Sequence, residues 1–183
     1  NAGVYDVIVG NTYGSVTSAL ATLTVFGIDF GDAPAPLYPT LLANDGARHV
    51  IVPGIHLGTS ADAEADGLAN GTASGDDVNG QDDEDGVQWN GVLHVGQTQT
   101  IEVIASTNGY LNGWLDFDAA GGWTQSGEQV LTNALLVTGT NLLTVAVPAN
   151  AITGPTFARL RFSTVSGLGL TGLAPDGEVE DHQ

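Results

Sequence analysis

The chain has 183 residues, with 21 Asp and Glu against only three basic residues, all Arg, and its formal net charge is −18 at pH 7. This charge excludes nucleic acid as a partner and disfavours anionic membranes, since both need clustered Lys and Arg. The absence of Cys excludes disulfides and thiolate metal sites. A compact chain of this charge repels itself unless cations neutralise part of it, so the composition already favours bound cations.

The first 25 residues stand apart from the rest as two amphipathic strand patterns, Val4–Val9 and Ser15–Val25. They resemble the last two strands of a bacterial immunoglobulin-like domain, with Tyr5 at the place of the tyrosine corner in that fold. The alternative is a plain hairpin that belongs to the following domain. Residues 26–36 contain Gly and Pro at the places expected of a boundary, so we expect two units, 1–25 and 26–183.

Strand patterns also dominate the remainder of the chain, at Thr98–Ala105, Asn141–Val147 and Phe157–Phe162. Asn-Gly pairs at 90–91, 108–109 and 112–113 predict turns between short strands. No stretch has the spacing of an amphipathic helix. The sequence therefore predicts an all-β fold, an antiparallel β-sandwich of jelly-roll-like type preceded by the hairpin.

A long acidic loop runs from residue 62 to residue 85, with small residues between the acids. Hard cations take six to eight oxygen ligands, and closely spaced acids with Gly at sharp bends supply them. The alternative is an acidic loop that faces solvent and binds no ion. The candidate calcium ligands in this loop are Asp62, Glu64, Asp66, Asp76, Asp77, Asp82, Asp83 and Asp85.

Two further acidic clusters can supply ligands to the same ions. Asp116 and Asp118 lie on one face of a predicted strand end, with Glu128 near them in the sequence. Near the end of the chain, Glu178 and Glu180 alternate onto one face and Asp181 follows. We therefore add Glu178, Glu180 and Asp181 to the candidate ligands, with Asp116 and Asp118 as weaker candidates.

The motif Gly177-Glu-Val-Glu-Asp181 resembles the signature of the bacterial GEVED domain, and the resemblance extends over residues 28–182. It implies a β-sandwich of large secreted bacterial proteins, located outside the cell or on its surface, in which the acids coordinate calcium. It also adds Asp29 and Asp32 as weaker metal candidates. The family pattern has Asn and Asp where this chain has Asp118 and Ala120, so an ion there would lose one ligand. The other matching segments are Asp29-Phe-Gly-Asp-Ala-Pro34, Ala47-Arg-His49, Leu57-Gly58, Asp62-Ala-Glu64, Gly75-Asp-Asp77, Asp82-Asp-Glu-Asp-Gly86, Gly113-Trp-Leu-Asp-Phe117 and Ala158-Arg-Leu-Arg161.

Other residues point to function less strongly. No nucleophile or zinc-protease motif is present, and the His residues lack zinc spacing. Arg48 and His49 are expected to serve the acidic cluster or to face solvent. Trp114 and Trp123 either stack on sugar or, as we favour, pack in the core.

We expect a non-enzymatic calcium-binding module that is structural or adhesive, a subunit or repeat of a surface fibre or filament. Its partners would be other copies of itself or neighbouring repeats, bound through β-strands. A start at Asn1 indicates a processed chain or a piece of a longer one. The hairpin is then either a segment that packs against a neighbouring subunit or repeat, or the end of a domain that was cut. The alternative function is a carbohydrate-binding accessory domain of a secreted hydrolase.

Overall fold

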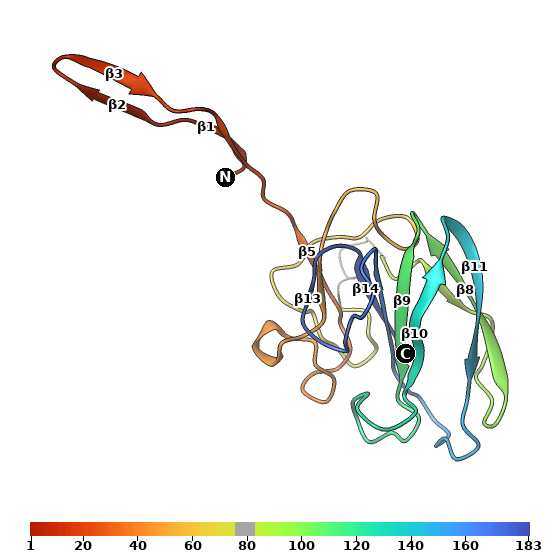
Figure 1. Ribbon diagram of the computed structural model, residues 1–183. Helices are drawn as coiled ribbons and strands as arrows, with labels where there is room; N and C mark the ends of the chain where they lie inside the picture. Colours follow the sequence, from red (N-terminus) through yellow and green to blue (C-terminus); the bar gives the residue numbers. More distant parts are fainter. Residues whose placement is uncertain (76–82) are drawn as a thin grey trace.

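The computed structural model describes residues 1–75 and 83–183 (Figure 1). Within that part of the chain the regular structure is β-strands and one 3₁₀ turn, η1 (Leu42–Asn44). The predicted all-β class is confirmed. Among the described residues, no helix is long and apolar enough to cross a membrane.

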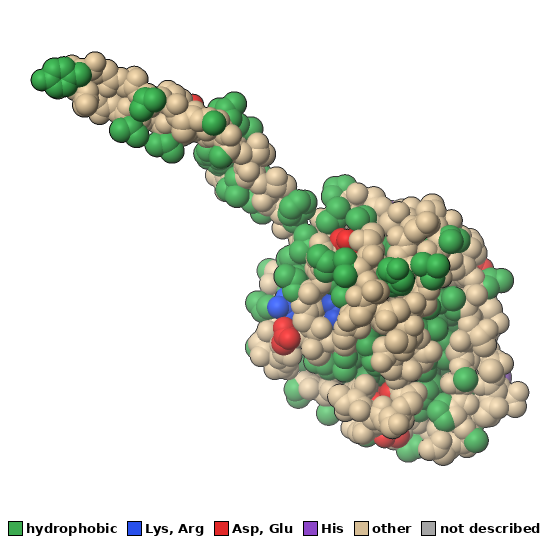
Figure 2. Space-filling model, viewed as in Figure 1, with side chains coloured by type: hydrophobic (Ala, Val, Ile, Leu, Met, Phe, Trp, Pro, Cys, Tyr) green, Lys and Arg blue, Asp and Glu red, His purple; other side chains and the backbone are tan. Residues whose placement is uncertain are grey.

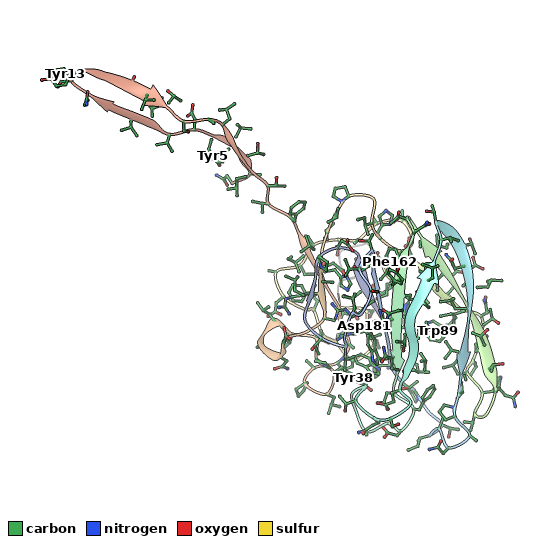
Figure 3. The ribbon with its side chains drawn as sticks, viewed as in Figure 1. Tyr5, Tyr13, Tyr38, Trp89, Phe162 and Asp181 are labelled. Carbon is green, nitrogen blue, oxygen red and sulfur yellow. The ribbon has the colours of Figure 1, made fainter. Side chains whose placement is uncertain are left out.

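The first four strands form a long ribbon that projects from the rest of the molecule (Figure 1). β1 pairs with β4 and β2 pairs with β3, all antiparallel, so the ribbon is one hairpin with an interruption. Tyr13 lies at its tip and is 98% exposed (Figure 3). The strands are β1 (Gly3–Tyr5), β2 (Ile8–Asn11), β3 (Gly14–Thr17) and β4 (Ala21–Leu23).

Two larger sheets form the body of the molecule. One has the order β10-β9-β12-β14 and the other the order β11-β8-β7, and both are antiparallel. The alternating pattern that predicted a strand at Thr98–Ala105 is confirmed, because β8 has these bounds. The strands are β7 (Val87–Trp89), β8 (Thr98–Ala105), β9 (Gly109–Leu115), β10 (Gln129–Leu136), β11 (Gly139–Ala146), β12 (Ala158–Ser163) and β14 (Glu178–His182).

Both of these sheets contribute side chains to one apolar core. Ile101 and Val103 of β8 pack in the same cluster as Leu111 of β9 and Phe162 of β12, and all four are completely buried. Burial of such side chains stabilises the fold by roughly 1.5–3 kcal/mol each. The core therefore holds the two sheets together and fixes the edge on which β14 lies.

A third, small sheet has the order β13-β6-β5 and covers the other side of β14. β5 (Ile28–Phe30) pairs antiparallel with β6 (Arg48–Val50), whereas β13 (Leu173–Ala174) pairs with β6 in parallel. β14 is thereby enclosed between β12 on one side and the β5–β6 pair on the other. This enclosure explains why its charged side chains are buried.

One predicted turn is wrong, because the pair at 112–113 lies inside β9 rather than between strands. Asn112 is 1% exposed, and its side-chain oxygen accepts the backbone N–H of Asn133 at 2.9 Å. Asn133 has a φ of 48° and sits where the register of β10 shifts against β9. The Asn112 side chain thus provides an acceptor for a backbone N–H at the irregular position of β10. The residues around Asn112 in the sequence do not indicate this role.

Candidate metal centre

The centre is built around β14, whose first residue follows a glycine that no other residue can replace without strain. Gly177 has a φ of +91°, and a Cβ at this position would lie 1.8 Å from the carbonyl oxygen of Phe162. From this turn β14 runs antiparallel to β12, from Glu178 opposite Phe162 to His182 opposite Ala158. The strand thus carries its acids directly into the interior.

Glu178 and Glu180 lie on the same face of β14, as the alternation predicts, and both are 0% exposed. Glu178 Oε2 accepts the backbone N–H of Leu57 at 2.6 Å, and Glu180 Oε1 accepts that of Gly86 at 2.9 Å. A Cβ on Gly86 would lie 2.6 Å from Glu180 Oε1, so only glycine allows this close approach. Both carboxylates are therefore fixed by backbone from other segments.

Further acids approach from β5 and from the segment that follows β6. Asp29 of β5 is 1% exposed, and its Oδ2 accepts the backbone N–H of Val179 at 2.7 Å. Glu64 Oε2 accepts the backbone N–H of Phe30 at 2.9 Å. Acids from two distant parts of the chain thus accept backbone N–H groups of β14 and β5.

Asp62 and Asp83 extend this group on the loop side. Asp83 is 5% exposed, and its Oδ2 accepts the backbone N–H of Asp62 at 3.0 Å. The charge of Asp83 also acts on Glu178, which places the two carboxylates in one electrostatic environment. We call Asp29, Asp62, Glu64, Asp83, Glu178 and Glu180 the acidic cluster.

The acidic cluster strongly disfavours negative charge on its own members. Burial, and then the charges of Glu180 and Asp29, raise the pKa of Glu178 well above its usual range. Burial raises the pKa of Glu64 to about 10, with smaller contributions from a hydrogen bond to Asp62 and the charge of Asp29. Without a cation the Glu64 carboxyl group keeps its proton at neutral pH, and a bound cation would replace that proton.

None of the three arginines of the chain forms an ion pair with Glu178 or Glu180. Arg159 forms a buried ion pair with Asp181, and Arg48 forms an exposed one with Asp45. Arg161 donates instead to a histidine ring and to backbone carbonyl groups. Glu180 Oε2 lies 3.0 Å from His182 Nε2, so of these two acids Glu178 is the one that most needs a proton or a bound cation.

Several carboxylate oxygens of the acidic cluster accept no hydrogen bond within the described part of the chain. Glu178 Oε1 is buried and has no donor there, and the same holds for Asp62 Oδ1 and Glu64 Oε1. An unsatisfied buried polar atom costs about 1–3 kcal/mol, and more if it is charged. A calcium ion takes oxygen ligands of this kind.

Three of the predicted ligands lie in other interactions. Asp66 is exposed, and its Oδ1 accepts the backbone N–H of Leu42 at 2.6 Å. Asp85 accepts both the backbone N–H and the hydroxyl of Thr59. Both carboxylate oxygens of Asp181 accept hydrogen bonds from Arg159. We therefore leave these three acids out of the ligand set that we propose.

The other predictions around this site have mixed outcomes. Asp76, Asp77 and Asp82 lie outside the described residues. Asp32 is completely buried, and its Oδ2 accepts the backbone N–H of Gly75 at 2.6 Å.

The neighbouring Arg48 and His49 do not contact the acidic cluster. Arg48 pairs with Asp45, and His49 contacts Arg161 and the backbone carbonyl of Asp176. Burial, followed by the charge of Arg161, lowers the pKa of His49. Its ring is therefore neutral and serves to position Arg161.

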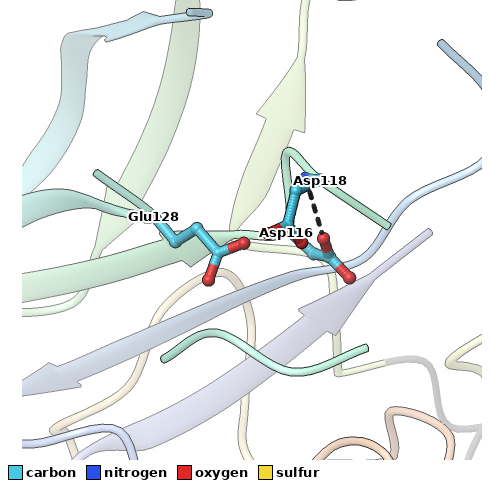
Figure 4. A group of neighbouring side chains, drawn as sticks. All are labelled: Asp116, Asp118 and Glu128. Carbon is cyan, nitrogen blue, oxygen red and sulfur yellow. Dashed lines mark hydrogen bonds between the residues drawn. The ribbon is translucent and has the colours of Figure 1, made fainter. Parts of the chain in front are cut away.

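A second acidic group lies where β9 ends and β10 begins. Asp116, Asp118 and Glu128 place one carboxylate oxygen each within 4.8 Å of one another (Figure 4). Asp116 and Glu128 are each 2% exposed, whereas Asp118 is exposed. Glu128 lies near Asp116 and Asp118 in the sequence but is not among the candidate ligands predicted from it.

The tryptophans that could have stacked on sugar are instead buried. Trp114 is 5% exposed and Trp123 is 2% exposed, and both pack with Tyr38. The guanidinium of Arg159 lies 4.7 Å from the centre of the Trp123 ring. Core packing, which we favoured, is confirmed, and the sugar platform is wrong for these two residues.

Sequence reasoning missed two functional neighbours. The hydroxyl of Tyr38 donates to Asp116 Oδ2 at 2.7 Å, and Arg159 neutralises Asp181. Nothing near Tyr38 in the sequence indicates its acidic partner, which is 78 residues away. For Arg159 a signal existed, since it alternates with apolar residues in a strand that pairs with the acidic one.

One comparison with known protein families finds a match in the second part of the chain. The GEVED domain family model matches residues 110–183. This match covers β12 and β14, and with them Glu178, Glu180 and the second acidic group. No curated protein and no solved structure matches the chain.

Proposed function

We propose that this chain is a non-enzymatic extracellular module, a β-sandwich made rigid by calcium bound in the acidic cluster. The observation that carries this proposal is the Glu178 carboxylate. It is completely buried beside other acids, and its Oε1 has no donor among the described residues. A calcium ion would supply the positive charge and the missing oxygen partner together.

The chemistry of the ligands favours calcium over other metals. The acidic cluster offers carboxylate oxygens, and the chain has no Cys for a soft metal. The imidazole of His49, the buried histidine nearest β14, contacts Arg161 and a backbone carbonyl. Ligands that come from separate loops and strands suit the flexible coordination of calcium better than the strict octahedron of magnesium.

The role of the ion would be to cross-link distant parts of the chain. Asp29 lies in β5, Glu64 in a loop and Glu178 in the last strand, so calcium bound in the acidic cluster would link three segments. Ions that bind only the folded state stabilise it by mass action. Calcium would therefore hold the small sheet and the loop against the main sheet.

Calcium titration by isothermal calorimetry of the wild type and Glu178→Gln tests this role. Gln keeps the acceptor for the Leu57 N–H and removes the charge, so the variant folds but binds calcium at least about tenfold more weakly. Glu102→Gln, which changes an acid on β8 of the other sheet, is the matched control and should bind like the wild type. Equal affinity of Glu178→Gln and the wild type would refute the proposal.

The projecting hairpin supports an association role through β-strands. Its apolar side chains, including Val4, Ile8, Val16 and Leu23, are each at least half exposed on the isolated chain (Figure 2). The two edges of the ribbon pair with no other described strand. Exposed apolar ribbons with open edges add to neighbouring sheets. The hairpin would thus join this module to a neighbouring copy or repeat at a bacterial cell surface.

One contact in the hairpin favours its relation to an immunoglobulin-like domain. The hydroxyl of Tyr5 donates to the backbone carbonyl of Asn1 at 2.7 Å. In the tyrosine corner of such domains the hydroxyl bonds to backbone a few residues upstream in the same way. The ribbon therefore has the local geometry expected of the closing strands of that fold.

Carbohydrate binding is the alternative function, and one surface cavity is a candidate site for it. Trp89, Pro155 and His182 border a cavity of about 330 Å³. The Trp89 ring also packs edge-on against that of His182. A ligand there should quench or shift tryptophan fluorescence, and loss of that signal in Trp89→Ala would support this alternative.

A further inference from the structure

The second acidic group is held together by the pairing of β9 with β10. Asp116 directly follows β9 and Glu128 directly precedes β10, and these strands are antiparallel neighbours. The backbone N–H of Leu115 donates to the carbonyl of Glu128 at 2.9 Å. The sheet itself therefore brings two acids that are twelve positions apart to the same place.

Each carboxylate of the group accepts at least one backbone N–H. Asp116 Oδ1 accepts the N–H of Asp118 at 3.1 Å, and Asp118 Oδ1 accepts that of Ala120 at 2.9 Å (Figure 4). Glu128 Oε2 accepts the N–H of Gln125 at 2.8 Å. These bonds fix the orientation of the three carboxylates.

An independent observation indicates a ligand at this place. Glu128 is 2% exposed, and its Oε1 is buried without a hydrogen-bond partner among the described residues. Glu128 supplies one of the oxygens that lie within 4.8 Å of those of Asp116 and Asp118. None of the three arginines of the chain forms an ion pair with this group.

We propose that Asp116, Asp118 and Glu128 form a second calcium-binding site, separate from the acidic cluster and independent of it. Three carboxylates give the charge that a divalent cation needs. A cavity of about 240 Å³ lies beside Asp118 and Glu128 and leaves room for water ligands. Its lining also includes Gln125 and Asn150, whose side-chain oxygens are of the type that calcium accepts.

Ala120 has no carboxylate to offer as a ligand, and this lowers the calcium affinity expected of the second site. Glu128 replaces the ligand that Ala120 cannot offer, but one ligand comes from the exposed Asp118. Sites with few and partly exposed ligands have calcium dissociation constants of about 10⁻⁴–10⁻³ M. We therefore expect the second site to be the weaker one.

An ion at this place would also fix a part of the chain that the acidic cluster does not reach. Asp116 Oδ2 accepts the hydroxyl of Tyr38, whose ring centre lies 4.4 Å from that of Trp123. The loop between Asp116 and Glu128 contains Trp123 itself. Ion binding would hence tie the loop, the tyrosine and the tryptophan together.

Titration with calcium chloride alone tests the second site, with Glu102→Gln as the control. The wild type should show a tight and a weak binding phase. In Glu128→Gln the affinity of the weak phase should fall by about tenfold or more, and the tight phase should be unchanged. Asp118→Asn, which alters an exposed side chain and should fold normally, should weaken the same phase.

The result separates this site from the proposed function. Glu178→Gln should lose the tight phase and keep the weak one, which is the opposite of Glu128→Gln. A weak phase that is unchanged in both Glu128→Gln and Asp118→Asn, or absent from the wild type, would overturn the second site only. Equal binding of magnesium chloride would overturn its assignment to calcium.

Discussion

Arg159 and Asp181 form a buried bidentate ion pair, with Nε 2.7 Å from Oδ1 and Nη2 2.7 Å from Oδ2. Glu178 and Glu180 lie in the same strand and are as deeply buried, but neither faces an arginine. One acid of the motif is thus neutralised by the chain itself. Its neighbours depend on protons or on a bound ion.

Asp181→Asn should therefore destabilise the protein whether or not calcium is present. Removal of one partner leaves the guanidinium of Arg159 buried without its counter-charge, which costs about 3–5 kcal/mol. Urea unfolding of the variant in calcium and in chelator measures this cost. A loss of stability that appears in calcium but not in chelator would show that Asp181 is a metal ligand after all.

Glu178→Gln should behave in the opposite way. In chelator the amide stands in for the protonated acid, so the variant should be at least as stable as the wild type. In calcium it should be the less stable of the two, because only the wild type gains from the ion. A large loss of stability in chelator would contradict the role that we assign to this residue.

The calcium-free protein should lose stability as the pH rises from about 7 to about 9. The pKa of Glu178 is raised by burial and that of Glu64 reaches about 10, whereas an unfolded Glu has a pKa of about 4.3. In this window the folded state binds more protons than the unfolded state, so the free energy of unfolding falls with rising pH. Below about pH 6.5 the buried His49 acts in the opposite sense, so that range is avoided.

Urea midpoints in chelator across this window give the measurement. The stabilisation added by calcium should grow over the same range, because binding displaces the protons of the acidic cluster. The Glu178→Gln variant should show a shallower slope in chelator. A wild type that gains stability between about pH 7 and 9 without calcium would be at odds with protonated buried acids.

Within the acidic cluster, the strand acids should matter more than the loop acids. Glu178 and Glu180 are fixed in β14, whereas Asp83 lies in a loop where another carboxylate can take its place. The double change of Glu178 and Glu180 to Gln should weaken calcium binding strongly, and Asp83→Asn should weaken it little. Calorimetric titration of the two variants compares them, and equal losses would reverse the ranking.

The hairpin should be needed for association and not for folding of the body. Deletion of residues 1–25 removes exposed apolar side chains such as Val9 and Val16, and the hairpin pairs with none of the other described strands. The truncated protein should keep its melting temperature. Electron microscopy should show head-to-tail assemblies of the full chain and none of the truncated protein. Assemblies that persist without the hairpin would rule out strand donation.

Local patterns were sufficient to predict the all-β class and the shared face of Glu178 and Glu180. Both follow from alternation along one strand, which needs no knowledge of the rest of the fold. The fate of Asp181 could not be predicted in this way. Its neutralisation depends on the register between β12 and β14, which places Arg159 opposite it.

The loop acids show the same limit more clearly. Asp66 and Asp85 resemble ligands in the sequence, but the structure uses them to accept hydrogen bonds from Leu42 and Thr59. Asp and Ser or Thr commonly bond to nearby backbone in loops, so an acidic loop contains both ligands and structural acceptors. Which acids become structural acceptors depends on donors 24 and 26 residues away in the sequence, on Leu42 and Thr59, and these contacts are set by the whole fold.

The melting temperature with excess calcium and with excess chelator tests the central claim most directly. Calcium at about 100 times its dissociation constant adds about 2.7 kcal/mol to the stability. For a chain of this size that gain corresponds to a rise of roughly 5–11 °C. We predict such a rise in the wild type and a clearly smaller one in Glu178→Gln, and identical wild-type melting curves in calcium and in chelator would contradict the account.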